Sequence, residues 1–314
     1  MSDHALLLAQ AREYDARGDV YNAVKLYKRC IKLAPEVVEA YVQLAEIYKR
    51  RTEWKPAMYY AKKALSLDAS LADTWWTLGI TAVALGKERL ANSVWSKFGP
   101  SNPRDALISL QLTHNGLFEM IWAKPLDPAR AQITSIPHPD SDRHFLDIVV
   151  FDRQVIGYNV AKRRRFPVHA ELGIQQRSLY FTFSCWLESP TKKDVQTLER
   201  LCVEAHLGFE IWSKAARVQK RVYNDKLQEY YSGDLFQKEE ENLLVAIAAK
   251  QEAHVEQVLR AWTIITLRQY FALERHLMFN LPYSFYLFLS SETLFRRQPI
   301  HQRNKTGGKK RTDS

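Results

Sequence analysis

The sequence contains few cysteines and no long apolar stretch. Its three cysteines, Cys30, Cys185 and Cys202, are odd in number and widely separated along 314 residues. This pattern excludes a disulfide framework and favours reduced thiols in a cytoplasmic protein. No run of about 18 apolar residues occurs, so we expect no membrane-spanning helix. The first residues contain neither a basic leader nor a small-residue cleavage site, so we predict no signal peptide.

The sequence also lacks the short motifs that mark common enzymes. The phosphate-binding G-x-x-x-x-G-K-[ST], the dinucleotide-binding G-x-G-x-x-G, the nucleophile turn G-x-S-x-G and the zinc motif H-E-x-x-H are all absent. The 9 histidines occur singly. His138 and His144 flank Asp140 and Asp142, but in a proline-rich loop this spacing favours a solvated turn over a metal site. We therefore predict no catalysis, no cofactor and no bound metal.

The positive charge is concentrated near the end of the sequence. The formal net charge is +10, and residues 296–314 contain 7 basic residues and 1 acidic residue. Residues 1–103 contain 15 basic and 11 acidic residues, and the segment between these two regions is close to neutral. Because the excess lies mostly in the last residues, it argues against a folded face built for nucleic acid.

A repeat of 34 residues runs through the first third of the sequence. Small residues recur at Ala23, Ala57 and Ala91, and Pro35 aligns with Pro103 two periods later. Large residues such as Tyr27 and Trp95 share a further column, as expected where helices of a hairpin approach closely. This pattern resembles the tetratricopeptide repeat (TPR). The resemblance implies an all-α solenoid of three helical hairpins, His4–Val37, Val38–Leu71 and Ala72–Asp105.

The resemblance also implies where a partner binds, because the first helix of each hairpin lines the concave side of such a solenoid. The corresponding groove positions are Leu8, Arg12, Val42, Glu46, Trp76 and Ile80. The lysines and asparagines that clamp a terminal carboxylate in some TPR proteins are missing. The sequence therefore favours an apolar or helical peptide as the partner. For Trp76 a second interpretation stays open, in which it packs against the following domain.

Residues 106–176 have a different character, and we predict a capping helix followed by a small β-rich subdomain. "DALISLQLTH" is the candidate helix. Ile148–Phe151 and Val155–Val160, joined by "DRQ", are predicted to form a β-hairpin. Four basic residues stand together at Lys162, Arg163, Arg164 and Arg165. A solvated hairpin loop is the favoured interpretation of this run, and an RNA or phosphate contact is the alternative.

Residues 177–281 read as two strand–helix–strand units. The first has strands at Leu179–Leu187 and Gly208–Trp212, joined by a serine-capped helix whose inward face carries Val195, Leu198, Leu201 and Cys202. The second has a strand at Leu243–Ala249, a helix at Gln251–Trp262 and a returning strand at Arg268–Leu277. This order predicts an α+β, ferredoxin-like sandwich. An all-helical fold from Lys214 onward is the alternative.

The predicted fold is thus multidomain: a TPR domain over 1–105, a capping helix and β-rich subdomain over 106–176, an α+β domain over 177–281 and a C-terminal extension over 282–314 with a disordered basic tail. Within the extension, Phe285–Phe295 suits an edge strand or short helix, or alternatively a membrane-surface anchor. The layout resembles uncharacterised bacterial proteins that fuse TPRs to a strand-rich C-terminal part. The resembling stretches include "VWSKFG", "IWAKPLDPARAQI" and "DIVVFDRQVIGY".

These observations predict an interaction protein. We expect a cytoplasmic adaptor or scaffold that binds another protein in the TPR groove without catalysis. The alternative is an RNA-associated factor that uses Lys162–Arg165 and the basic tail for phosphate affinity.

Overall fold

The computed structural model describes residues 3–98, 107–114, 117–161, 164–213, 223–224, 229–231 and 241–276. The chain divides into one compact unit of residues 1–277 and a second unit of residues 278–314. The predicted disordered tail and the Phe285–Phe295 segment lie outside the described residues. Within the described part, no helix combines the length and the apolar character needed to cross a bilayer.

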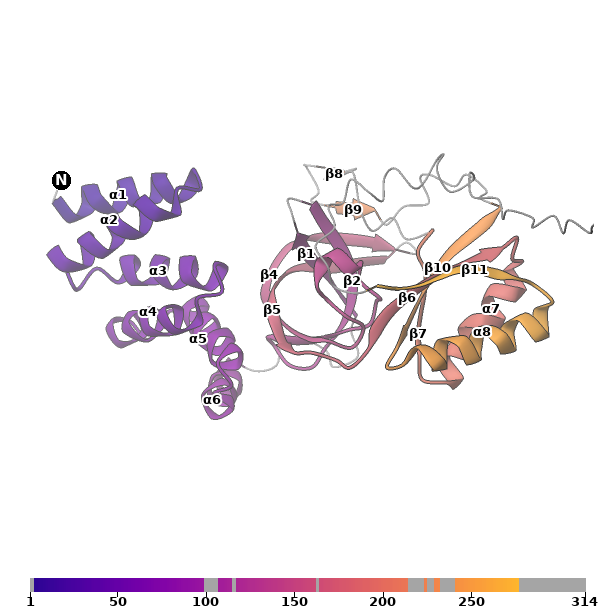
Figure 1. Cartoon of the computed structure of the whole chain (residues 1–314). Coiled ribbons are helices and arrows are strands. Elements are labelled where there is room, and N and C mark those ends of the chain that lie inside the picture. Colours follow the sequence, from indigo (N-terminus) through magenta and orange to yellow (C-terminus); the bar gives the residue numbers. More distant parts are fainter. Residues whose placement is uncertain are drawn as a thin grey trace, which may run out of the picture. The chain divides into compact units, whose positions relative to one another are not determined.

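Six helices form three antiparallel hairpins at the N-terminal end of the chain (Figure 1). Glycines in the left-handed conformation make the turns inside the first and third hairpins, with φ of 79° at Gly18 and 67° at Gly86. The second helices of the hairpins begin at Val20, Trp54 and Glu88, so they keep the spacing of the sequence repeat. The helices are α1 (Asp3–Ala16), α2 (Val20–Leu33), α3 (Val38–Arg50), α4 (Trp54–Leu67), α5 (Ala72–Ala84) and α6 (Glu88–Phe98).

Small residues stand where the helices approach most closely. Ala23 and Ala57 are completely buried and Ala91 is 1% exposed. At Gly79 on α5 no side chain would fit, since a Cβ there would overlap the indole ring of Trp95 on α6. The spacing of small and large residues therefore fixes how the hairpins pack, as the sequence predicted.

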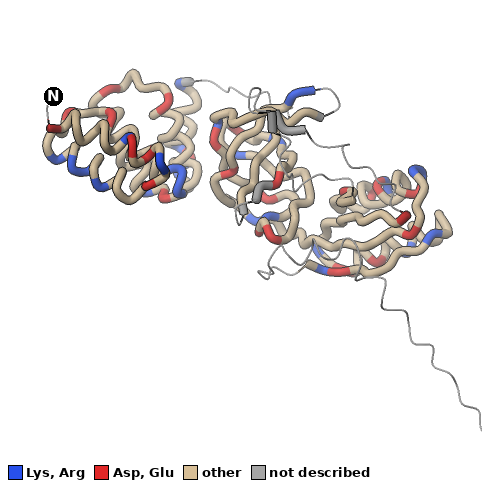
Figure 2. The backbone as a smooth tube through the Cα atoms, turned by 90° about the horizontal axis from the view of Figure 1, so that it is seen from above, with Lys and Arg blue, Asp and Glu red and all other residues tan. Residues whose placement is uncertain are grey.

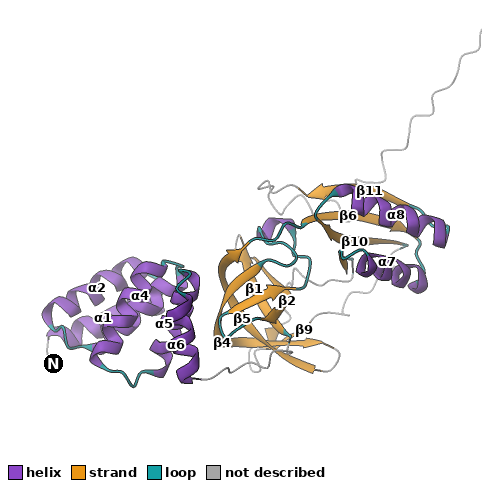
Figure 3. Cartoon of the chain, turned by 90° about the horizontal axis from the view of Figure 1, so that it is seen from below, coloured by secondary structure: helices purple, strands orange, loops and turns teal. Residues whose placement is uncertain are grey.

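Five strands follow and pair into a closed sheet (Figure 3). Each strand pairs with the next in the chain, and β1 also pairs in parallel with β5, which closes the ring. Its interior is apolar and includes Leu110, Ile121, Ile133, Val149 and Phe151. The short strands β8 (Tyr223–Asn224) and β9 (Glu229–Tyr231) extend this sheet beside β4. The strands of the ring are β1 (Ile108–His114), β2 (Leu117–Pro125), β3 (Arg130–Ile133), β4 (Ile148–Ala161) and β5 (Arg164–Gln176).

Two predictions for this region were wrong. Residues 108–114 form strand β1 and not a capping helix, because Ile108, Leu110 and Leu112 alternate into the core with the period of a strand. Residues 148–160 form one continuous strand and not a hairpin. β4 pairs along its length with β5, so the "DRQ" segment interrupts the strand without reversing it.

The remaining described elements build a four-stranded antiparallel sheet with two helices on one face (Figure 1). The strand order is β11-β6-β10-β7. Leu198 and Cys202 of α7 and Leu259 and Trp262 of α8 are buried in one core with alternate residues of the strands. The elements are β6 (Phe181–Glu188), α7 (Lys192–Glu204), β7 (Gly208–Ile211), β10 (Asn242–Ala249), α8 (Glu252–Thr266) and β11 (Tyr270–His276).

The strands β10 and β11 exclude the all-helical alternative for the described residues beyond 214. The cap of α7 differs in detail from the prediction. Thr191, and not a serine, accepts the backbone N–H of Asp194, and the Asp194 carboxylate accepts the N–H of Thr191 in return. This reciprocal capping box stabilises the start of the helix.

Candidate functional site on the helical repeats

The predicted groove residues all lie on the first helices of the three hairpins, α1, α3 and α5, which we call the first-helix face. Arg12 on α1 is exposed, and Leu8 and Val42 are partly buried. Glu46 on α3 is also partly buried. Towards α5 the character changes, because Trp76 is 5% exposed and Ile80 is completely buried. The face is therefore at least partly exposed at Leu8, Arg12 and Val42 and buried at Trp76 and Ile80.

Charged side chains tie neighbouring hairpins together across this face. The Arg12 guanidinium donates to Glu39 of α3, with Nε 2.6 Å from the carboxylate. Arg50 of α3 reaches back to Asp15 of α1 at 2.7 Å. The Arg12–Glu39 pair is largely exposed, so it orders the surface more than it stabilises the fold.

The closed sheet covers the third hairpin. Trp76 and Ile80 belong to one apolar core with Val150 of β4 and Leu172 of β5. The guanidinium of Arg153 lies over the indole of Trp76, 4.3 Å from the ring centre, and also pairs with Asp73 at 3.2 Å. Of the two interpretations of Trp76, the structure therefore agrees with the one in which this side chain packs against the following domain. Neither Trp76 nor Ile80 offers contact area to a partner in this arrangement.

A buried lysine joins the same two regions. Lys49 of α3 lies 2.8 Å from Glu46 and 2.8 Å from Asp152 of β4, and its side chain is only 6% exposed. Glu46 also accepts a hydrogen bond from the Thr77 hydroxyl of α5. Burial acts to lower the pKa of Lys49, but the two carboxylates together hold this pKa above its ordinary value. Glu46 is thus engaged within the chain.

A bulge in β4 contributes polar contacts with the second and third hairpins. Phe151 pairs with Glu171 and Val155 pairs with His169, so Asp152, Arg153 and Gln154 stand opposite a single residue of β5. The extra residues turn the Asp152 and Arg153 side chains toward α3 and α5. In the sequence, the polar triplet Asp152–Gln154 between two apolar runs indicates that the strand is interrupted. It does not show whether the interruption is a bulge or a turn.

The three helical hairpins and their buried small residues recur with the 34-residue period of the sequence. Helices α1 to α6 have the arrangement of three tetratricopeptide repeats. No protein-family model matches the chain, and no curated protein sequence matches it either. Solved structures of other TPR proteins do align with part of it.

Three of these structures illustrate the extent of the similarity. A crystal structure of the MamA protein is 21% identical over 30% of this chain, with a TM-score of 0.29, and the alignment spans about half (51%) of that chain. The TPR2B domain of yeast Sti1, in complex with pHsp70, is 22% identical over 30% of this chain and 74% of its own, with a TM-score of 0.28. The first TPR of Spaghetti (RPAP3), bound to an HSP90 peptide, is 20% identical over 32% of this chain and 81% of its own, with a TM-score of 0.29.

A buried histidine lies next to the bulge that meets the third TPR. His169 is 4% exposed, and burial lowers its pKa despite backbone groups at Asp152, Arg153 and Gln154 that favour the charged form. Burial likewise lowers the pKa of His144 and His276.

Acidification is therefore expected to destabilise the protein. A lowered pKa favours the neutral imidazole in the fold, so the stabilisation is present above the ordinary value of 6.5 and is lost as the pH falls toward the folded-state pKa values. The urea midpoint of unfolding should be lower at about pH 5.5 than at about pH 7.5. His169→Gln should reduce this difference, whereas His254→Gln, at an exposed position, should leave it unchanged. Equal midpoints at both pH values would contradict this expectation.

The basic run that was the alternative site is only partly described. Lys162 and Arg163 lie outside the described residues, whereas Arg164 and Arg165 begin β5 and are exposed. The guanidinium of Arg165 lies 4.4 Å from the ring centre of Tyr158 on β4. The two arginines therefore lie in the first residues of β5, paired with the end of β4.

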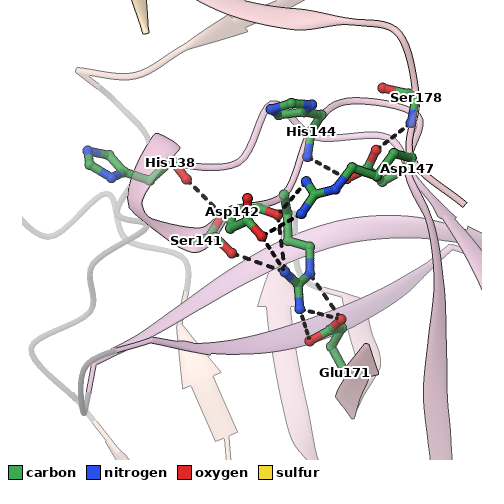
Figure 4. Close-up of polar contacts among 9 residues, drawn as sticks. His138, Ser141, Asp142, His144, Asp147, Glu171 and Ser178 are labelled. Carbon is green, nitrogen blue, oxygen red and sulfur yellow. Dashed lines mark hydrogen bonds and ion pairs between the residues drawn. The ribbon is translucent and has the colours of Figure 1, made fainter. Parts of the chain in front are cut away.

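His138 and His144, which flank "PDSD", belong to a polar cluster that lies outside the helical repeats (Figure 4). The fully buried Asp147 accepts the backbone N–H groups of His144 at 2.8 Å and Ser178 at 2.7 Å. Arg143 pairs with Glu171 of β5 at 2.9 Å. The imidazoles of His138 and His144 lie apart from each other. No group of side chains suited to a metal ion occurs within the described ranges. The cluster joins the segment 143–147, which precedes β4, to β5 and to the residues between β5 and β6.

The three cysteines have the properties of buried apolar side chains. Burial raises the pKa of Cys185 and of Cys202 to about 12, and it also raises the pKa of Cys30. A thiol with a raised pKa is not ionised near neutral pH and is a poor nucleophile. These residues therefore supply no catalytic group.

Proposed function

We propose that this protein is a non-catalytic adaptor that binds a segment of a partner protein on the TPRs. The contact surface is the first-helix face of the first two hairpins, with Leu8 and Val42 giving apolar area and Arg12 giving charge. The observation that carries the proposal is the division of this face. Arg12 is exposed and Leu8 and Val42 are partly exposed, whereas Glu46, Trp76 and Ile80 are engaged by the chain itself.

The partner segment is proposed to be apolar or helical. Val42 and Leu8 stand on adjacent first helices, and an amphipathic helix laid across them would bury its apolar face there. The Arg12–Glu39 pair at the rim would set the orientation of the segment. The buried, reduced cysteines support a cytoplasmic location.

We further propose the division into parts at 1–105, 106–176, 177–281 and 282–314. The part over 177–281 is assigned as a ferredoxin-like sandwich. The strand order β11-β6-β10-β7 and the two helices on one face support this assignment. The RNA-associated alternative rests on Lys162–Arg165 and the tail, of which only Arg164 and Arg165 are described.

Site-specific photo-crosslinking tests the binding surface. A photoreactive phenylalanine analogue at position 42 is expected to crosslink a polypeptide in native extract, because this side chain lies on the open part of the face. The same analogue at Val203, a 65% exposed position on α7, is the matched control and should give no such product. Once the crosslinked segment is identified, Val42→Asp in the full chain should weaken its binding at least about tenfold.

Two outcomes would overturn the proposal. One is equal crosslinking from positions 42 and 203, and the other is a product at position 42 that disappears on nuclease treatment. The pair-swapped variant Arg12→Glu/Glu39→Arg preserves the salt bridge while reversing its direction. It should keep the fold and still lose affinity, which separates a role in binding from a role in stability.

A further inference from the structure

The second helices of the first two hairpins carry only positive charge. Within its bounds, α2 contains Lys25, Lys28, Arg29 and Lys32 and no acidic residue, and α4 contains Lys55, Lys62 and Lys63 and no acidic residue. In these two hairpins the acidic residues within the helices lie instead on α1 and α3, where several are paired, as in Arg12–Glu39 and Arg50–Asp15. The low net charge of the N-terminal region therefore conceals a separation of charge between the two sets of helices.

The cations stand at matching positions of successive repeats. Lys28 matches Lys62 and Arg29 matches Lys63, each one period later. At two further positions the residue types are exchanged between the repeats. Tyr21 is replaced by Lys55 one period later, and Lys25 is replaced by Tyr59. Spacings of four, seven and eight residues from the first position place each set on one face of its helix. We call this surface the second-helix face; it consists of Tyr21, Lys25, Lys28, Arg29, Lys55, Tyr59, Lys62 and Lys63.

All eight side chains of the second-helix face are exposed. In the part of the chain that the structure describes, none of the six cations forms an ion pair. Lys28 instead lies 5.6 Å from the ring centre of Tyr48, and Lys63 lies 6.0 Å from that of Tyr59. Figure 2 shows successive blue stretches along one edge of the helical repeats. A row of cations without ion-pair partners attracts a polyanion.

Two exposed aromatic rings lie among these cations. Tyr21 is 76% exposed and Tyr59 is 55% exposed, although large aromatic side chains are usually mostly buried. Cations that follow a phosphate backbone, with interspersed aromatic rings on which bases stack, are the combination that binds single strands. We propose that the second-helix face binds single-stranded nucleic acid without reading its sequence. This surface is separate from the first-helix face.

Other polyanions fit this surface less well. An anionic bilayer would require an apolar stripe beside the cations, but here the exposed Leu33 and Leu67 stand at the last positions of α2 and α4. An acidic peptide would use the cations but would give the two exposed tyrosine rings no stacking partner. A single-stranded nucleic acid uses both features.

Binding of the full-length protein to a fluorescent oligouridylate of about 20 nucleotides, measured at several salt concentrations, tests the proposal. The triple variant Lys25→Gln/Arg29→Gln/Lys63→Gln is expected to reduce the slope of log K against log salt by about 2 and to weaken binding at least tenfold at about 0.1 M salt. The control Lys192→Gln/Lys193→Gln/Arg200→Gln removes the same charge from exposed positions of α7 and should change binding less than about twofold.

Variants of the two tyrosines distinguish base stacking from electrostatic attraction between the cations and the phosphates. Tyr21→Ala and Tyr59→Ala should each weaken binding about tenfold, whereas Tyr21→Phe and Tyr59→Phe should retain it. The proposal is overturned by absence of binding, by equal losses in the two triple variants, or by alanine variants that bind like the wild type. It is also overturned if phosphatidylserine vesicles or polyglutamate compete as well as the oligonucleotide does. None of these outcomes bears on crosslinking at position 42, so the two surfaces are tested independently.

Discussion

Replacement of Gly79 by valine is expected to destabilise the TPRs by about 3 kcal/mol, because the new side chain has no space. A Cβ at position 79 would lie 2.5 Å from Cζ3 and 3.0 Å from Cζ2 of Trp95. Trp95 has little freedom to move, since it is 9% exposed and its ring lies 5.1 Å from that of Trp76. The overlap outweighs the gain in helix propensity of about 0.5 kcal/mol that replacing a helical glycine would otherwise give. Urea unfolding measures the loss.

Two further variants show whether the overlap causes this loss. Ala72→Val lies at the exposed start of the same helix and should change the free energy of unfolding by no more than about 0.5 kcal/mol. Adding Trp95→Leu to Gly79→Val should recover at least about 1 kcal/mol relative to the sum of the single effects, because the smaller side chain relieves the overlap. Strictly additive losses would show that the two side chains do not meet.

Replacement of Asp152 by alanine is expected to cost about 3 kcal/mol and to loosen the contact of β4 with α3. Lys49 is buried between Asp152 and Glu46, at 2.8 Å from each carboxylate. Burial acts to lower the pKa of Lys49 and both carboxylates oppose it, so removal of Asp152 leaves the buried amine with a single carboxylate partner. Amide exchange in the β4 bulge and in α5 should become about 100-fold faster.

An exposed pair on α8 supplies the control for this effect. Glu256→Ala removes the partner of Arg260, and both side chains are well exposed. The free energy of unfolding should then change by no more than about 0.5 kcal/mol. If Asp152→Ala also cost no more than about 0.5 kcal/mol, Lys49 would be solvated and β4 would not cover it.

The helical repeats could be predicted from the sequence because their contacts are local. Residues 34 apart occupy equivalent positions, and the small residue at Gly79 and the large one at Trp95 meet within one hairpin. The same holds for the strand–helix–strand order near the C-terminal end, where Leu198 and Cys202 follow helical spacing into the core. Period and propensity are sufficient for such elements.

The closed sheet was harder to predict because its pairings join distant residues. Ser109 of β1 lies opposite Val168 of β5, and no local pattern in either segment signals this partner. The continuity of β4 through Asp152–Gln154 likewise depends on β5, since only a long partner strand turns a polar interruption into a bulge.

The candidate site shows the same limit. The repeat pattern identified the helices on which Leu8, Val42 and Trp76 lie, but not which of these side chains stay open. Trp76 is buried by Val150 and Arg153, which are far along the chain from it. The separation of charge between first and second helices could have been found in the sequence by counting acidic and basic residues helix by helix.

A double-mutant cycle between Lys49 and Asp152 tests most directly that β4 packs on the helical repeats, where it contacts α3 of the second hairpin and α5 of the third. Urea unfolding of the wild type, Lys49→Met, Asp152→Ala and the double variant gives the coupling energy between the two side chains. We predict a coupling of about 2 kcal/mol, with the double variant much less destabilised than the sum of the single losses, because removing both charges leaves no buried ion unpaired. Additivity within about 0.5 kcal/mol would contradict the contact between α3 and β4.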